Sequence, residues 1–216
     1  MKRIFLLFLI LCLLLAGCGR TQAEEPAAGE PTAAIRTVCP LPDTAMDNLT
    51  DAILSVSLEE GDAYVDDTGI MRMDLKIWSY DRYDMVDIGS LQVGDILVTH
   101  SGEVEVTSLD RIDDGTVIIN GGLEGEGFDL VTDEGGIFYE RGFNDAKNWY
   151  EAGETTIRVS VDFRFTDSSD PELGEILFYP GSFLIGEVTN YDFTPYNTVI
   201  RVENGQIIEM NRWFIP

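Results

Sequence analysis

Hydrophobic and polar residues alternate along two long stretches of the chain. Every second residue from Met71 to Ile77 is apolar, and the same period runs from Ile157 through Val161 to Phe165. A two-residue period places successive side chains on opposite faces of a β-strand. We therefore expect two half-buried strands, with Val161 on the buried face of the second.

Turn motifs separate these stretches from the other apolar runs. The pairs that tolerate the backbone angles of tight hairpins are Ser101-Gly102, Asp114-Gly115, Gly135-Gly136 and Asn204-Gly205. Pro180-Gly181 favours a type II turn between strands at residues 176–179 and 183–188. The spacing predicts an all-β domain of antiparallel strands, either barrel-like or a sandwich.

Two local patterns add detail to this prediction. Asp43 or Thr44 can begin a short N-terminal helix that runs to Ile53, the only helix we expect. Leu91–Val98 is typical of the entry into a strand of a small β-barrel, where Gly94 makes a tight corner and Asp95 accepts hydrogen bonds from turn amides. Neither pattern indicates a function.

The N-terminus has the pattern of an export signal. Lys2 and Arg3 precede an unbroken apolar run from Ile4 to Leu15. This run is too short for a mature transmembrane helix, which needs about 20 residues, and fits the apolar region of a signal peptide.

The residues Leu15-Ala16-Gly17-Cys18 closely resemble the lipobox of bacterial lipoproteins. The resemblance covers only the signal region. It implies cleavage before Cys18 and attachment of a diacylglyceryl group to the Cys18 thiol. The chain then divides into a signal peptide (1–17), a lipidated Cys with a flexible stalk (18–36) and one β-rich domain (37–216). We expect an exported protein held at the outer face of the cell membrane by its lipid.

Charge restricts the function further. The chain has 14 Lys and Arg against 39 Asp and Glu, which gives a formal net charge of −25. A nucleic-acid partner is excluded because such binding needs a basic face. One His and three Cys are too few for a zinc site built from those residues. Cys39 and His100 form no recognisable nucleophile–base motif, and we expect no role for either.

Aromatic residues are the first candidates for ligand binding. If the apolar residues of 71–77 face the core, Trp78 and Tyr80 share the opposite face, and Trp149 and Tyr150 lie in a loop. Exposed neighbouring aromatic side chains can stack on sugar rings or anchor a protein partner. The predicted partners are therefore a glycan or an envelope protein.

Acidic clusters are the second candidates, since calcium prefers carboxylate and carbonyl oxygens. No segment has the spacing of an EF-hand loop. The carboxylates considered are Asp110, Asp113, Asp114, Asp167, Asp170 and Glu172.

Three functions stay open at this stage. The favoured one is a cell-envelope lipoprotein whose β-domain binds a ligand or partner without catalysis. The alternatives are a calcium-binding or calcium-stabilised surface domain, and an envelope hydrolase that uses two carboxylates on a glycan.

Overall fold

The computed structural model describes residues 35–215, with Phe143 described in its backbone only. The predicted signal peptide, Cys18 and the stalk up to residue 34 lie outside the described residues. Within 35–215, no helix combines the length and the apolar character that a membrane crossing requires.

The described residues are mainly β-structure, which confirms the predicted all-β class. The strands are β1 (Thr37–Val38), β2 (Ala52–Ser57), β3 (Ala63–Val65), β4 (Met71–Ser79), β5 (Arg82–Tyr83), β6 (Ile96–Thr99), β7 (Gly102–Glu105), β8 (Leu109–Arg111), β9 (Val117–Ile119), β10 (Phe128–Thr132), β11 (Phe138–Arg141), β12 (Tyr150–Ser168), β13 (Ile176–Phe178), β14 (Thr198–Glu203) and β15 (Gln206–Trp213). The helical segments are α2 (Met85–Gly89), α3 (Pro180–Leu184), and the 3₁₀ turns η1 (Gly122–Glu124) and η2 (Phe143–Asp145).

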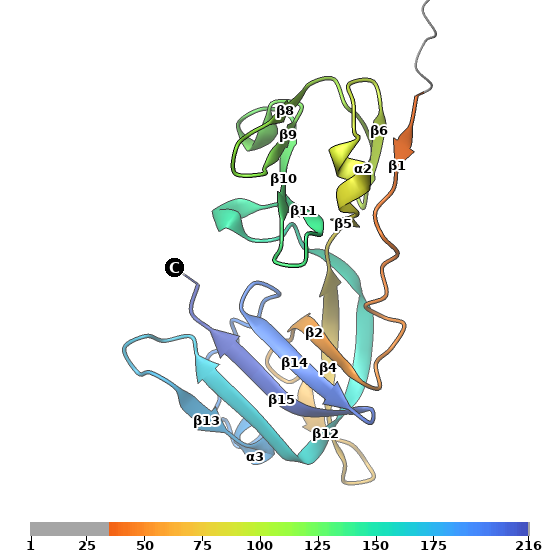
Figure 1. Cartoon of the computed structure of the whole chain (residues 1–216). Helices are drawn as coiled ribbons and strands as arrows, with labels where there is room; N and C mark the ends of the chain where they lie inside the picture. The colour runs from red at the N-terminus through yellow and green to blue at the C-terminus, as the bar shows by residue number, and fades with distance from the viewer. Residues whose placement is uncertain (1–34, 216) are drawn as a thin grey trace, which may run out of the picture. The chain divides into compact units, whose positions relative to one another are not determined.

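Five strands, β2, β4, β12, β14 and β15, close into a ring that we call the barrel (Figure 1). Each strand is hydrogen-bonded to the next in the order β2, β4, β12, β15 and β14, and β14 pairs in turn with β2. Within this ring only the β12–β15 pair is parallel. Numbered along the chain, the strands lie in the order 1-2-3-5-4-1. Strand order by itself implies no function.

The long strand β12 closes the barrel by bending. Its first half pairs with β4 and its second half with β15 and β13, and the register shifts between Val159 and Arg164. Val161 lies in this bend and is 84% exposed, so the prediction that it is buried was wrong. The residues on either side, Ile157 and Phe163, keep the predicted inward orientation.

The barrel core follows the predicted alternation of β4, whose residues from Met71 to Ile77 are buried at every second position. The α3 helix adds Phe183, whose ring lies 5.5 Å from that of Phe165. Pro180-Gly181 therefore begins a helix rather than a type II turn, and residues 183–188 form no strand. The fixed φ of proline suits the first helical position, and burial of Phe183 stabilises the short helix.

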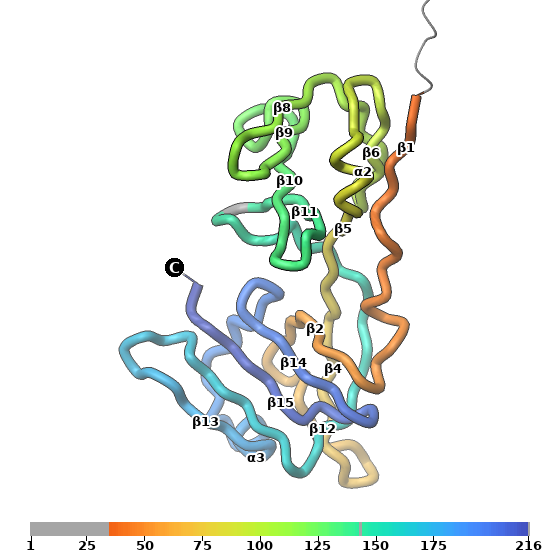
Figure 2. Tube along the Cα trace, in the orientation of Figure 1, coloured from red at the N-terminus to blue at the C-terminus, as the bar shows by residue number. Residues whose placement is uncertain are grey.

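Residues 80–149 leave the barrel after β4 and return at β12 (Figure 2); we call them the insert. The insert contains a sheet of order β5-β11-β10-β9-β8, while β6 and β7 pair with β1 in a second sheet. A hydrophobic core separate from that of the barrel holds these sheets together. Its buried residues are Val38, Tyr83, Ile88, Leu91, Leu97, Val106, Val117, Ile119, Phe128, Leu130 and Phe138.

Three of the four predicted hairpin pairs lie at turns, whereas the turn between β6 and β7 is His100-Ser101 and Gly102 begins β7. In the β14–β15 turn, both Asn204 and Gly205 have positive φ angles, as a two-residue turn requires. Gly94 also has a positive φ, and Asp95 accepts hydrogen bonds from the backbone N–H groups of Gln92 and Arg36, so the local geometry predicted for Leu91–Val98 is present. The strand that follows, β6, pairs with β1 and β7 and is not a strand of the barrel.

The predicted helix from Asp43 to Ile53 is absent from the structure. Asp43 does accept a hydrogen bond from the backbone N–H of Ala45, but only a single turn follows. The Asn48 side chain then accepts from the N–H groups of Thr50 and Asp51, so the chain turns before it enters β2.

Candidate functional site

Three of the four predicted aromatic residues line one cleft of about 430 Å³, which we call the aromatic cleft. The outer surfaces of β2 and β4 border it, together with the chain segments around Asp43–Asn48 and Lys147–Trp149. Its lining residues are Asp43, Thr44, Ala45, Asn48, Asp51, Ala52, Ile53, Leu54, Ser55, Trp78, Ser79, Tyr80, Arg82, Lys147 and Trp149.

The alternation of β4 turns Trp78 away from the barrel core, and the side chain is half-buried. Its indole Nε1–H donates a hydrogen bond to Ser57 Oγ on β2 at 2.9 Å. This bond fixes the orientation of the indole ring, and a fixed ring loses little entropy when a ligand stacks on it.

Tyr80 continues the same alternation one step beyond the end of β4. Its ring packs edge-on against Trp149, with 5.1 Å between the ring centroids and 80° between the planes. Residues from opposite ends of the insert thus meet beside the cleft. The ring of Tyr139 on β11 also packs edge-on with the ring of Tyr80, with 5.9 Å between the ring centroids.

Lys147 carries the charge nearest to these rings. Its ammonium nitrogen lies 4.0 Å from the centroid of Tyr80, 5.7 Å from Tyr139 and 5.6 Å from Trp149. It also donates a hydrogen bond to the Tyr80 hydroxyl at 2.9 Å. The loop that presents Lys147 is tight, since Asn144 and Asp145 both have positive φ angles.

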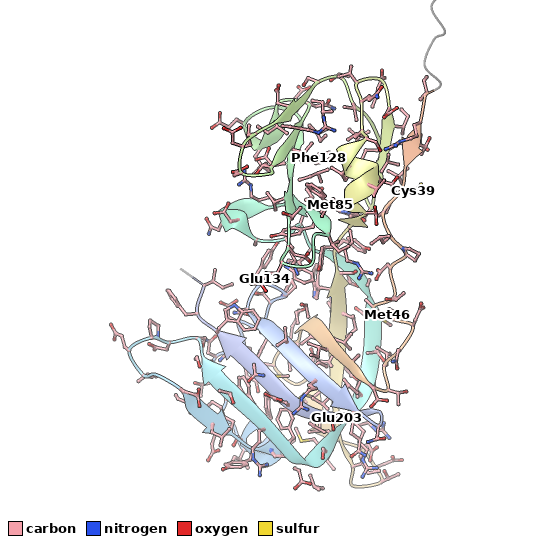
Figure 3. All side chains as sticks on the ribbon, in the orientation of Figure 1. Cys39, Met46, Met85, Phe128, Glu134 and Glu203 are labelled. Carbon is pink, nitrogen blue, oxygen red and sulfur yellow. The ribbon has the colours of Figure 1, made fainter. Side chains whose placement is uncertain are left out.

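Asp43 holds the segment 43–48, which borders the cleft, against the barrel strands. Its carboxylate accepts hydrogen bonds from Ser79 Oγ at 2.9 Å and from the Tyr150 hydroxyl at 3.1 Å. Met46, labelled in Figure 3, packs on β12 at Gly153, where a Cβ atom would lie 3.1 Å from the Met46 methyl carbon. Segment 43–48 therefore has polar and apolar anchors on two strands.

Tyr150 does not line the cleft, unlike Trp149 beside it, because neighbouring residues of a strand point to opposite sides. Its ring stacks on His100 at 4.7 Å. His100 Nδ1 lies 3.0 Å from Asp81 Oδ2, and the His100 backbone N–H donates to the same oxygen at 2.7 Å. His100 is at the turn where we expected it, but it is paired with a buried carboxylate.

Two groups near this histidine have altered pKa values. Burial raises the pKa of Glu140, and the nearby charge of Asp81 acts in the same direction; a hydrogen bond from Asn148 and the charge of His100 partly offset them. Burial also raises the pKa of Tyr150, which keeps its hydroxyl protonated and able to donate to Asp43.

Three of the six candidate calcium ligands, Asp114, Asp167 and Asp170, have other partners in the structure. Asp167 forms an ion pair with the buried Arg212, and Asp114 accepts a hydrogen bond from the backbone N–H of Thr116. Asp170 likewise accepts from the backbone N–H of Glu172, while Asp110 lies on β8 and Asp113 in the turn after it. Among residues 35–215, no group of three or more His, Cys, Asp or Glu is placed to hold a metal ion. Calcium binding stays a prediction.

Two other hollows differ in character from the aromatic cleft. One, of about 500 Å³, is bordered by four carboxylates and Lys76 and has no aromatic lining residue. The other, of about 700 Å³, lies between β3 and α3; its aromatic lining residues are Tyr64, Phe183 and Tyr191, but it has no Trp, and Phe183 belongs to the barrel core.

No protein-family model matches this chain, and neither a curated protein nor a solved structure matches it.

Sequence reasoning did not include several residues that the fold brings to the site. Lys147 precedes Trp149 by two residues, so the period of a strand was a usable signal for a shared face. Asp43 and Tyr139 carried no comparable signal, because they are distant in sequence from Ser79 and Tyr80. Cys39 is an exposed free thiol in the structure.

Proposed function

We propose that this protein is an exported lipoprotein whose β-domain binds glycan in the aromatic cleft without catalysing a reaction. The export signal and the lipobox at Cys18 support the location and the anchor. The gathering of Trp78, Tyr80 and Trp149 around one cleft is the observation that carries the ligand class.

The lining combines the two kinds of group that sugars require. The C–H face of a pyranose ring stacks on an aromatic ring, while its hydroxyl groups need donors and acceptors held in fixed positions. Trp78 and Trp149 supply indole rings, and Asp51 and Arg82 supply polar groups at the same cleft.

Non-catalytic binding is favoured by how the Asp43 carboxylate is used. It accepts hydrogen bonds from Ala45, Ser79 and Tyr150, so it holds the cleft wall in place. A carboxylate that accepts three hydrogen bonds from the protein is stabilised in its ionised form and is poorly suited to act as a general acid.

Titration of the purified full-length protein with N-acetylglucosamine tetramer, followed by tryptophan fluorescence and calorimetry, tests the glycan proposal. We expect Trp149→Ala and Trp78→Ala each to weaken binding about tenfold or more, as for stacked aromatic anchors. Trp213→Ala is the matched control, because Trp213 ends β15 and does not line the cleft. Equal losses in all three variants, or no binding to the wild type, would contradict the proposal.

The anchor is tested separately by metabolic labelling with palmitate. We expect the wild type to incorporate label and to partition into the detergent phase. Cys18→Ser should abolish both. Incorporation that persists in Cys18→Ser would overturn lipidation at this residue.

A further inference from the structure

Three aromatic rings surround the ammonium group of Lys147 beside the cleft. They come from the end of β4 (Tyr80), from β11 (Tyr139) and from the residue before β12 (Trp149). The negative faces of aromatic rings attract a cation, and the Tyr80 hydroxyl accepts one of its N–H groups at 2.9 Å. We call Tyr80, Tyr139 and Trp149 the cage.

Aromatic rings and not a carboxylate surround the ammonium group of Lys147, and among residues 35–215 Arg82 and Arg158 likewise have no carboxylate within 4.0 Å. With 39 Asp and Glu against 14 Lys and Arg, carboxylate partners are abundant. Yet among residues 35–215 no carboxylate oxygen lies within 4.0 Å of Lys147 Nζ, whereas Lys76 pairs with Glu151 and Glu154. The cage alone therefore compensates the Lys147 charge at close range.

Two of the three cage residues also border the aromatic cleft. Tyr80, Trp149 and Lys147 itself line the aromatic cleft, and Asp43 and Asp51 line it too. Arg82 is the other cation of the lining, so the formal charges of the cleft balance while Lys147 is in the cage, and a ligand ammonium that takes its place there keeps that balance.

We propose that the cage is a subsite for a primary ammonium group of the glycan, in which Lys147 acts as an intramolecular ligand that an incoming amine displaces. This inference rests on the proposed glycan-binding function. A primary ammonium fits better than a quaternary one, because only N–H groups donate to the Tyr80 hydroxyl. The ligand class is a glycan with free glucosamine units. Displacing a tethered ligand lowers the apparent affinity of the wild type.

The test compares two tetramers that differ at the amine. The purified full-length protein is titrated at about pH 6, where a sugar amine is mostly protonated, with glucosamine tetramer and with N-acetylglucosamine tetramer. Lys147→Gln vacates the cage and keeps a side chain of similar length. Arg158→Gln, on the exposed face of β12, is the charge-matched control.

We expect Lys147→Gln to bind glucosamine tetramer about tenfold more tightly than the wild type, because the competing ammonium is gone. Its affinity for the acetylated tetramer should change less than about twofold. Adding Tyr80→Phe to Lys147→Gln keeps the aromatic ring but removes the hydroxyl that accepts the hydrogen bond. This double variant should bind glucosamine tetramer more weakly than Lys147→Gln does, with no change for the acetylated tetramer. Arg158→Gln should leave the ratio of the two affinities as in the wild type.

A second measurement needs no variant. If the amine ligand displaces Lys147, bound glucosamine tetramer should speed up the acylation of the Lys147 amino group by a soluble active ester. The acylation is measured by mass spectrometry of the peptide that contains Lys147. Unchanged acylation would overturn displacement.

The outcomes separate the two proposals. If the acetylated tetramer binds and Lys147→Gln shows no gain for the amine, the ammonium subsite is wrong and the glycan function stands. If neither tetramer binds the wild type or Lys147→Gln, both proposals are wrong.

Discussion

At the residue scale, buried and half-buried charged side chains make the stability of this protein depend on pH. Arg212 is only 2% exposed and pairs with Asp167, while its guanidinium lies 4.3 Å from the ring centroid of Phe193. Burial by itself raises the pKa of Asp167, but the hydrogen bonds from Arg212 and Ser169 outweigh it and lower the pKa below its ordinary value. Asp167 therefore contributes stability at neutral pH that is lost as the solution becomes acidic.

Glu140 has the opposite effect, and its substitution gives a pH-dependent prediction. Burial raises its pKa, so the folded state binds the proton more tightly than the unfolded chain. This contribution to stability is present below the unfolded pKa and is lost as pH rises through the folded pKa. We expect Glu140→Gln to raise the melting temperature at pH 7 by about 1–3 °C. The amide oxygen can still accept the hydrogen bond from Asn148.

The difference between Glu140→Gln and the wild type should vanish in melts near pH 4, where the unfolded chain also begins to hold the proton. Glu134→Gln is the control, since Glu134 is exposed in the turn between β10 and β11 (Figure 3). A gain in melting temperature that is the same at both pH values would show that charge at Glu140 is not the cause.

At the scale of elements, turns and bends decide which strands meet. The bend in β12 between Val159 and Arg164 lets one strand pair with β4 and then with β15. The two-residue turn at Asn204-Gly205 joins β14 to β15 at the register that completes the ring. Both features are needed for the barrel to close.

The β14–β15 turn makes a specific prediction about glycine. Gly205 has φ +70°, where a residue with a Cβ is strained even though no heavy atom lies within 4 Å of the added carbon. We expect Gly205→Ala to destabilise the protein by about 1 kcal/mol in urea unfolding. Gly181 in α3 has equally open space and no positive φ, so Gly181→Ala should be neutral or slightly stabilising. Equal losses in both variants would show that backbone conformation is not the cause.

The whole molecule is dominated by its negative charge. A net charge of −25 repels itself in the compact state, and the described ion pairs involve only a minority of the 39 acids. If the proposed lipid anchor is attached, we expect the same charge to repel anionic lipid headgroups, so that the domain extends away from the membrane.

Screening of this charge should be visible in thermal melts. We expect the melting temperature to rise by about 2–4 °C or more with added sodium chloride, since roughly 1 kcal/mol produces such a shift in a domain of this size. Calcium at matched ionic strength should give the same rise. A larger rise with calcium would contradict this and support a specific site, because a ligand that binds only the folded state stabilises it.

The local features of the fold could be predicted from the sequence because they depend on neighbouring residues. The alternation from Met71 to Ile77 fixed which face of β4 is buried, and therefore that Trp78 and Tyr80 lie on the other face. Asn204-Gly205 specified a tight turn because few other pairs tolerate positive φ at both positions. Predictions failed where two local preferences competed. The helix predicted from Asp43 does not form, because the Asn48 side chain accepts hydrogen bonds from the N–H groups of Thr50 and Asp51, which a helix would have bonded to backbone carbonyls.

By itself, the sequence determined the all-β class, the strand faces, the main hairpin turns and the acidic surface. It also supplied the signal and lipobox pattern, which the described residues do not include. Only the tertiary structure decided that β4 and β12 are neighbours, that residues 80–149 have their own core, and that Trp78, Tyr80 and Trp149 share a cleft with Asp43 and Lys147. The physical reason is that periodicity and turn preference act over a few residues, whereas strand pairing and side-chain clusters depend on contacts between distant segments.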